Sequence, residues 1–438
     1  MRGHVRSGLL VVAVCLLASV ANAQPFPGSG LLETQLVPDA RSAFDDVRFN
    51  RNTPIDQFLQ DTFSGAWMRL EYLNYQISDP AKVPLGVPLA DLEDPTTPFE
   101  VTGTDDTTIH MARVPRLQGI DLNQINGIKG SFGLPVGQFG YVEGSAWGLS
   151  ATSVFAQTDP LPFTNPSGMG SFGSQPITLL ATTLYGNGTA GNRLLIYDQD
   201  FAAAYSADIW SGEANIVYNI STPQQGLRVQ SLLGFRHIQY NENLAFGGTF
   251  SNISDFDTGT GPVVGPLTNS IASKAHNNMY GGQLGARIEY VADRLTFGVE
   301  PKVIFSNNRV TARVSTQNLR AAFVDTRTPD PLVIPAVQRL FSLNDDAVVT
   351  NASDTQFSPG FDLGLYAKLR VTNWLSLRAG YNILWLGNLT TPENNIYYND
   401  DGDTDTLAPN TPDVVVRQNT FSDRFIEGFT IGGEILLP

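Results

Sequence analysis

The chain has few charged residues, a single cysteine and no long apolar run beyond its first residues. Asp, Glu, Lys and Arg make up 16% of the 438 residues, against roughly 25% in ordinary soluble domains. Cys15 is the only cysteine, which excludes a disulfide within the chain and a metal site built from several cysteines. If the protein crosses a membrane, it must do so as a closed β-barrel, because no later segment could form a spanning helix and unpaired backbone groups are prohibitively costly in lipid.

The charge that is present is mostly negative. The formal net charge is −15 at pH 7, and the acidic residues concentrate between the strand-like segments, at 91–94, 105–106, 345–346 and 400–405. Contacts to nucleic-acid phosphates need clustered Lys and Arg. The composition therefore argues against a nucleic-acid partner and indicates a solvated acidic loop surface.

The N-terminus has the pattern of a secretory signal peptide. Arg2 and Arg6 precede an apolar run over 9–17, and a small-x-small site at 21–23 follows. We expect cleavage after Ala23, which removes Cys15. Residues 24–65 are then predicted to form a periplasmic N-terminal segment, either a tail or a plug inside the barrel.

The stretch YGGQLGARIEY, residues 280–290, gives the clearest indication of the fold. Its even positions are apolar or small with a tyrosine at each end, whereas its odd positions are small, polar or charged. Side chains of a strand alternate between two faces, so one face is apolar and the other polar. About ten tilted residues span the roughly 25 Å apolar band of a transmembrane barrel.

The same alternation recurs along the chain and predicts an all-β fold, a transmembrane antiparallel up-and-down β-barrel of the outer-membrane type over residues 66–438. Long gaps rich in Pro, Gly, Asn and Asp alternate with tight turns, which predicts long outer loops and short periplasmic turns. Ten strands is the minimum. Residues 177–205 and 307–358 could each hold another hairpin, so twelve to fourteen strands stay open. The predicted strands are 67–76, 114–122, 139–149, 206–220, 227–240, 278–291, 294–306, 360–371, 374–386 and 424–437.

Several of these segments resemble a known family. The strings WMRLEYLNY (67–75), IWSGEANIVYNI (209–220), GFRHIQYNENLAF (234–246), NNMYGGQLGARIEY (277–290) and LSLRAGYNILWLGN (375–388) come in the order of that family's strand motifs. They are similar to the putative beta-barrel porin-7 family of planctomycete-type bacteria. The resemblance covers roughly residue 67 to the C-terminus. It implies an outer-membrane barrel of porin type.

The polar faces of the predicted strands define a lumen with nearly balanced charge. These side chains either pair across strands and rigidify the wall or create a transverse field at a constriction. The predicted lumen-lining residues are Arg69, Glu71, Glu213, Asn215, Arg228, Arg236, Gln283, Arg287, Glu289, Glu300, Lys302, Asp362, Lys368, Arg370, Arg378 and Glu434.

Further predictions concern the membrane interfaces and the outer loops. Tyr280, Tyr290, Tyr381 and Trp385 are predicted to form an aromatic girdle. Asp401, Asp403 and Asp405 have the alternate spacing of a calcium loop, but the rest of that motif is missing. We expect either a weak divalent site for Ca²⁺ or Mg²⁺ or only a hydrated acidic loop there, and no other cofactor. The few histidines have no suitably placed serine partner, so we expect no enzyme activity.

The sequence therefore predicts a protein of the bacterial outer membrane with two alternative functions. The first is a porin-like channel for passive diffusion of small hydrophilic solutes or ions. The second is a non-conducting barrel that presents long acidic loops for adhesion or envelope structure. A secreted all-β binding module is a more distant alternative. The expected partners are outer-membrane lipid with lipopolysaccharide and the barrel assembly machinery, and the oligomeric state stays open.

Overall fold

The computed structural model divides the chain into two units, residues 1–61 and 62–438. All residues that it describes lie in the second unit. The predicted signal peptide and nearly all of the segment 24–65 therefore fall outside the described part. The described residues are 65–87, 99–102, 109–117, 120–136, 139–157, 177–186, 189–250, 267–317, 322–324, 333–334, 337–339, 348–400, 415–416 and 420–437.

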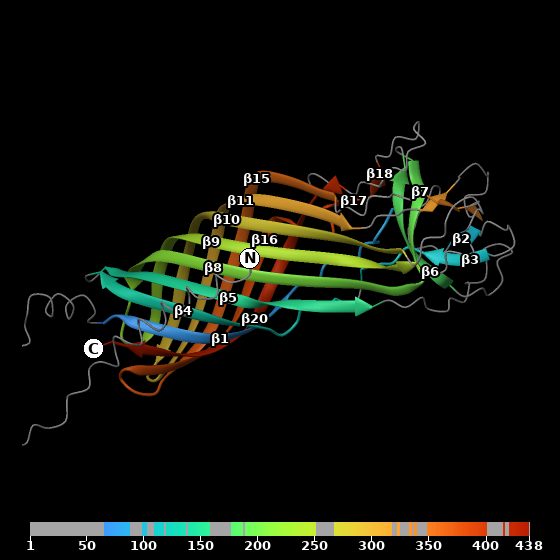
Figure 1. Ribbon diagram of the computed structural model, residues 1–438. Helices are drawn as coiled ribbons and strands as arrows, with labels where there is room; N and C mark the ends of the chain where they lie inside the picture. Colours follow the sequence, from blue (N-terminus) through green and yellow to red (C-terminus); the bar gives the residue numbers. More distant parts are fainter. Residues whose placement is uncertain are drawn as a thin grey trace, which may run out of the picture. The chain divides into compact units, whose positions relative to one another are not determined.

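Ten antiparallel strands close into a barrel (Figure 1). Each strand pairs with its neighbours in the barrel, and the first barrel strand closes the ring by pairing with both the second and the last. The strands are β1 (Trp67–Ile77), β4 (Ile125–Val136), β5 (Gly140–Gln157), β8 (Gln199–Ser221), β9 (Gly226–Phe250), β10 (Leu267–Ala292), β11 (Leu295–Gln317), β15 (Val348–Arg370), β16 (Leu375–Thr390) and β20 (Phe421–Leu436).

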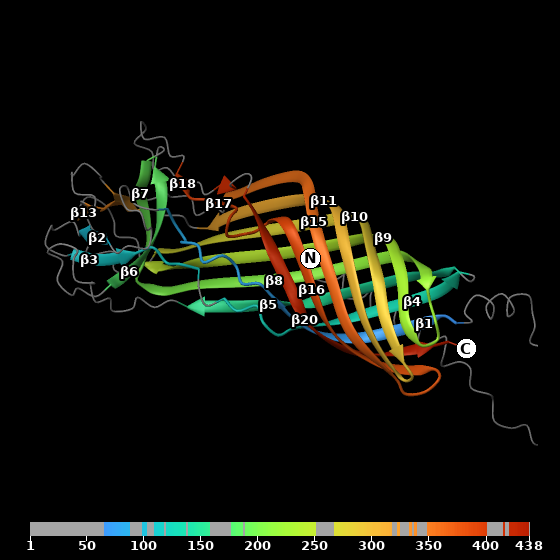
Figure 2. The ribbon, with the colours of Figure 1, turned by 180° about the vertical axis from the view of Figure 1, so that it is seen from behind.

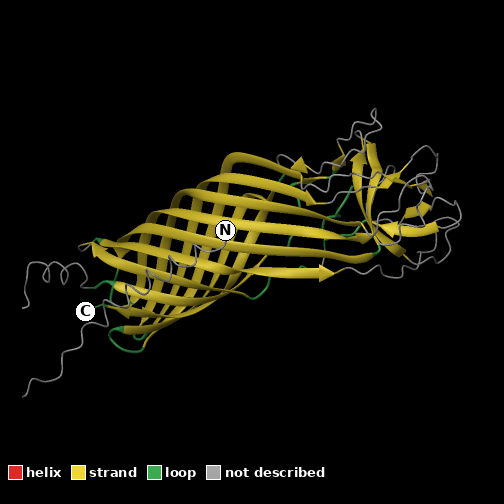
Figure 3. Ribbon diagram, viewed as in Figure 1, coloured by secondary structure: helices red, strands yellow, loops and turns green. Residues whose placement is uncertain are grey.

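Short turns join the strands at one end of the barrel, and long connections join them at the other (Figures 2 and 3). The turn between β10 and β11 holds Asp293 at a φ of 49°, a left-handed conformation that Asp tolerates better than most residues. In outer-membrane barrels the short turns are periplasmic, so the long connections lie on the outer side. Among the described residues, no helix has the length and apolar character to cross a bilayer.

The long connections build a second, smaller sheet. Its strands run in the order β13 (Val333–Ile334), β2 (Phe99–Thr102), β3 (Ile109–Arg113), β6 (Ile177–Gly186), β7 (Thr189–Tyr197), β12 (Ala322–Val324) and β14 (Val337–Arg339). Strand β18 (Asn399–Asp400) pairs with β6, and β17 (Ile396–Tyr397) pairs with β19 (Val415–Val416). Buried side chains of these segments belong to the same apolar cluster as barrel residues.

The structure confirms the barrel and corrects two details of the sequence prediction. Residues 114–122 are not a barrel strand: the second strand is β4, and the dipeptide Asn126-Gly127, a type that often forms turns, lies inside it and pairs with β1. Small residues on its inner face hid the alternation. The two regions that left twelve or fourteen strands open hold no additional barrel strand among the described residues, and the ring has ten.

The chemical character of the two faces of the long strands reverses partway along their length, although each side chain keeps its orientation. On β10, Leu284, Ile288 and Tyr290 point outward and are exposed, and Arg287 points inward. Beyond Tyr280, toward the outer side, the exposed face becomes polar, with Asn278, His276 and Lys274. The inner face becomes largely apolar, with Met279, Ala275 and Ile271 buried. The exterior therefore changes from apolar to polar partway along the strand.

The same reversal occurs on the neighbouring strands. On β11, Phe305 is the last exposed apolar side chain, and Asn307, Arg309 and Arg313 follow on the same face. On β9 the reversal follows Phe235. An outward-facing side chain is apolar where it contacts lipid and polar where it contacts water, so the reversal marks the outer edge of the membrane. Beyond it the barrel is built like a soluble protein, with its apolar side chains inside.

This boundary can be tested by placing an arginine on either side of it. Leu284→Arg introduces a cation into the middle of the lipid-facing belt and should cost roughly 2–4 kcal/mol of folding free energy in a bilayer. Asn278→Arg lies six residues farther toward the outer side, on the same face of β10. It should change the folding free energy by less than about 0.5 kcal/mol. Urea unfolding in lipid vesicles, followed by tryptophan fluorescence, measures both. Equal costs would contradict the assigned boundary.

Candidate functional site

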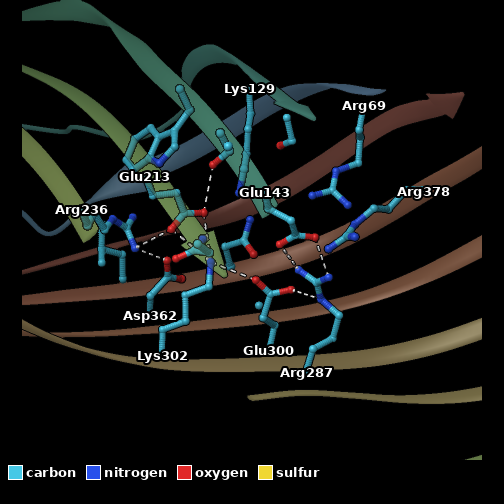
Figure 4. A pocket seen from close by; sticks show the side chains of 18 of the residues that line it. Arg69, Lys129, Glu143, Glu213, Arg236, Arg287, Glu300, Lys302, Asp362 and Arg378 are labelled. Carbon is cyan, nitrogen blue, oxygen red and sulfur yellow. Dashed lines mark hydrogen bonds and ion pairs between the residues drawn. The ribbon is translucent and has the colours of Figure 1, made fainter. Parts of the chain in front are cut away.

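The lumen within the membrane is crossed by a layer of charged side chains, which we call the charged layer (Figure 4). Every strand of the barrel contributes to it, because each places polar side chains on its inner face. Acidic and basic residues are interspersed around the ring, and most of them lie within ion-pair distance of an opposite charge. Its members are Arg69, Glu71, Lys129, Glu143, Glu213, Arg236, Arg287, Glu300, Lys302, Asp362, Arg378 and Glu434.

Glu213 on β8 is the centre of one half of the charged layer. Its carboxylate lies 3.0 Å from the Lys302 ammonium and 3.9 Å from the Arg236 guanidinium. It also accepts hydrogen bonds from Ser145 Oγ and Gln283 Nε2, both at 2.9 Å. Arg236 also forms an ion pair with Asp362 on β15, at 2.5 Å. Three hydrogen-bond donors and the nearby Arg236 guanidinium surround this one carboxylate, which balances the cost of removing its charge from water.

Arg287 on β10 joins Glu300 on β11 to Glu143 on β5, three strands away around the ring. It makes a two-pronged ion pair with Glu143 on β5, with N–O distances of 2.7 and 2.8 Å. Its Nε donates to Glu300 at 2.7 Å, and Glu300 also pairs with Lys302 at 2.9 Å. The pair Arg287–Glu143 therefore spans the lumen between strands that are not neighbours in the barrel.

A second chain of ion pairs runs along the opposite side of the wall. Glu71 on β1 lies 3.2 Å from Arg69 and 3.3 Å from Arg378. Arg69 also pairs with Glu434 on β20 at 3.4 Å, and Glu434 with Lys368 at 3.2 Å. Arg378 further stacks on the ring of Tyr366, 3.5 Å from its centroid, and the Tyr366 hydroxyl donates to Glu289 at 2.7 Å.

Side chains fill most of the space within the charged layer. Gly234 leaves room for Asn215, because a Cβ at Gly234 would lie 1.9 Å from Asn215 Oδ1. The cavity that remains among the lining side chains has a volume of about 40 Å³, enough for roughly three water molecules. On the periplasmic side a wider vestibule of about 260 Å³ opens, lined by residues such as Arg228, Arg69 and Glu289. The described side chains thus narrow the lumen to the size of water.

Beyond the charged layer, toward the outer side, the lumen becomes apolar. The inner faces of eight strands contribute large buried side chains next to the charged layer, and the connection after β1 adds Leu85, Leu117 and Leu122 to the same cluster. We call these side chains of the eight strands the apolar layer. It contains Leu73, Tyr75, Ile77, Ile125, Trp147, Leu149, Ile209, Ile238, Ile304, Leu384, Leu386 and Ile426.

A buried ionic cluster on the outer side of the apolar layer fastens an outer connection to the wall. Arg424 on β20 contacts Glu242 on β9 at 3.0 Å and Glu393, in the connection after β16, at 2.7 Å. The Tyr240 hydroxyl donates to Glu242 at 2.7 Å, and the Tyr205 hydroxyl donates to Glu393 at 3.1 Å. Burial raises the pKa of the Glu242 carboxyl, with Arg424 opposing that shift.

The structure brings most of the predicted lumen residues into this arrangement. Asn215 and Gln283 are buried, and the Gln283 amide donates a hydrogen bond to Asn215 Oδ1 at 2.5 Å. Arg228 and Arg370 lie instead at the periplasmic rim, where they donate to the turn carbonyls of Pro223 and Asp293. The prediction missed Lys129, because β4 was not recognised, and Glu143, which lies on the inner face of a strand that was recognised.

The remaining predicted positions lie on the exterior or outside the described residues. Tyr280 and Tyr290 are exposed on the lipid-facing surface at the two ends of the β10 span, and Tyr381 packs edge-on against Phe429 at 4.9 Å. Trp385 lies on the same face of β16 as Tyr381. Asp401, Asp403 and Asp405 fall outside the described residues. Within the described part, no three His, Cys, Asp or Glu side chains gather as metal ligands.

The comparison with protein families agrees with this architecture. The family model described as "Putative beta barrel porin-7 (BBP7)" matches residues 67–436. No curated protein matches the chain. The solved structures that it is similar to include the outer membrane protease OmpT from Escherichia coli, at 11% identity and a TM-score of 0.39, covering 86% of this chain and 98% of that one.

Two transport proteins are also among the similar structures. They are the toluene transporter TodX of P. putida, at 9% identity and a TM-score of 0.24, and the monoaromatic hydrocarbon channel CymD, at 9% identity and 0.24. The match to TodX covers 86% of this chain and 91% of the TodX chain, and the match to CymD covers 90% of this chain and 92% of the CymD chain. None of these similarities bears on what this chain binds.

Removing the cation that crosses the lumen should destabilise the barrel strongly. Arg287→Met leaves Glu143 and loses one partner of Glu300, which should cost roughly 3–5 kcal/mol. Adding Glu143→Gln should recover part of that loss, because the unpaired carboxylate is then removed. Arg294→Met, at an exposed turn, is the control. Urea unfolding in vesicles gives the free energies, and a cost for Arg287→Met no larger than the control would refute the ionic tie.

The outer ionic cluster should make stability depend on pH. The pKa of Glu242 is higher in the folded than in the unfolded protein, so folding favours the protonated form. Stability should therefore rise as the pH falls through the window that begins at this raised pKa and ends near 4.5. Glu242→Gln should remove this part of the pH dependence of the unfolding free energy. The difference in urea midpoint between wild type and variant, measured from pH 7 to pH 4.5, gives the contribution of Glu242. A difference that does not vary with pH would contradict the burial of this charge.

Proposed function

The chain belongs to the putative beta barrel porin-7 family, and we propose that it is a non-conducting outer-membrane barrel that holds a β-structured surface on the outer side of the cell. The observation that carries the proposal is the filling of the lumen. The charged layer leaves a cavity of only about 40 Å³, and the apolar layer follows it directly. A ten-stranded barrel is narrow enough for its own side chains to fill.

The energetics of the two layers support a permanent closure. Moving a hydrated ion through the charged layer would require breaking buried ion pairs such as Arg287–Glu143, and each broken pair leaves a charge without a partner. The apolar layer would then have to accept that ion away from water, at a cost of several kcal/mol. Either layer is a barrier, and the two lie in series.

The long outer strands support the surface role. They continue past the apolar belt with a polar exterior, and the outer connections form a sheet of their own around β6 and β7. The ionic cluster of Arg424, Glu242 and Glu393 ties one of these connections to the wall. A barrel that only sealed the membrane would not need so large an ordered structure in water. We propose no catalytic role.

A second candidate, passive diffusion of small solutes or ions, is favoured by the family's description and by the charged periplasmic vestibule of about 260 Å³. For this function the vestibule would have to connect to the outer side through a rearrangement of the charged layer.

Single-channel recording in a planar bilayer separates the two functions. We expect no discrete conductance steps from the folded wild-type barrel, its folding being verified by heat-shifted gel mobility. Replacing Tyr75, Trp147 and Leu384 with alanine removes bulk from the apolar layer and also widens the cavity of the charged layer, which the same three side chains line, so it should raise the leak current. The control replaces the outward-facing Leu70, Val142 and Leu377 with alanine. Wild-type steps that scale with salt would overturn the proposal and establish the channel.

A further inference from the structure

The outer wall of β10 and β11 carries a cluster of exposed cations just beyond the lipid-facing belt. Lys274 and Arg313 occupy directly paired positions, and Arg309 lies on the same face of β11, paired with Asn278. All three are exposed. We call these three residues the basic wall. They stand out because the chain as a whole carries a net charge of −15.

The basic wall has no acidic partner among the described residues. No ion pair involves its members there, and the outward-facing residues of β15 paired beside it are Asn351, Ser353 and Thr355. The nearest acid on the same wall is Asp208 on β8. Both of its carboxylate oxygens accept hydrogen bonds from Asn241 of β9, at 3.1 and 3.2 Å, and β9 and β10 separate Asp208 from β11. The positive charge of the basic wall is therefore not neutralised within this part of the chain.

The position of the basic wall relative to the membrane indicates its partner. Phe305 ends the apolar belt on β11, and Arg309 follows four residues later, about 10 Å higher on a tilted strand. The headgroup layer of a bilayer is roughly 5–8 Å thick on each side, so the long Arg309 side chain reaches it. Arg313 and Lys274 lie about another 10 Å farther out, level with a headgroup much larger than that of a simple phospholipid.

We infer that the basic wall binds an anionic glycolipid of the outer leaflet, one whose saccharide headgroup carries phosphate groups. Arg309 would contact a phosphate at the level of the headgroups, and Arg313 with Lys274 would contact acidic groups on the sugars above it. Arginine pairs with phosphate through two parallel hydrogen bonds. The neighbouring Asn278 and His276, exposed between these cations on β10, supply further polar contacts for sugar hydroxyls. The apolar belt directly beneath receives the acyl chains.

This inference is independent of whether the barrel conducts, since it concerns only the outer surface. The test uses the full-length protein in dodecyl maltoside micelles and a fluorescently labelled, phosphorylated rough lipopolysaccharide as the probe. The variant carries Lys274→Gln, Arg309→Gln and Arg313→Gln together. The matched control loses three cations from the periplasmic rim through Arg228→Gln, Arg294→Gln and Arg370→Gln. Heat-shifted gel mobility verifies that each barrel is folded.

We expect the basic-wall variant to bind the probe roughly 10- to 100-fold more weakly than wild type, and the control to bind within about twofold. Wild-type affinity should fall as salt is raised, because exposed charges are screened. Millimolar inorganic pyrophosphate should not displace the probe. Equal affinity of wild type and the basic-wall variant would overturn the inference, as would an equal loss in the control. Displacement by pyrophosphate would assign the site to free phosphate instead of a lipid.

Discussion

A strand that passes from lipid into water must exchange the character of its two faces, and the rest of this structure depends on that constraint. Side chains alternate strictly along a strand, so the outward face changes solvent while the inward face changes in the opposite sense. Within the membrane the inner face is free to be polar and becomes the charged layer. Outside the membrane the inner face becomes the apolar layer and the packed core of the outer structure.

The charged layer and the apolar layer close the lumen in different ways. In the charged layer, buried carboxylates and cations satisfy one another across strands that are far apart in sequence, as Arg287 and Glu143 do. Such pairs contribute little net stability but make any misplaced partner costly, which fixes the register of the whole ring. In the apolar layer, packing alone excludes water. A barrel of ten strands is small enough for both layers to span it.

Much of the fold could be predicted from the sequence, because the period-two pattern is a local property. Nine of the ten barrel strands follow from it, and so do most of the lumen residues. Strand β4 was not found, since three of the six residues on its inner face, Gly127, Ser131 and Gly133, are small and give little contrast with the outer face. The partners of each charge were also out of reach, because they depend on the closure of the ring. The reversal at Met279 and Tyr280 was visible as a change in which positions are apolar, and it marks the membrane edge.

A cysteine scan of β10 over residues 270–290, with a water-soluble maleimide applied to the protein in lipid vesicles, tests this account most directly. Even positions from 270 to 278 should react, because they face water. Even positions from 280 to 290 should be protected by lipid, and odd positions from 271 to 285 should be protected by the filled lumen. Rapid labelling of the odd positions from 281 to 285 would show an open, wet lumen and would contradict the account.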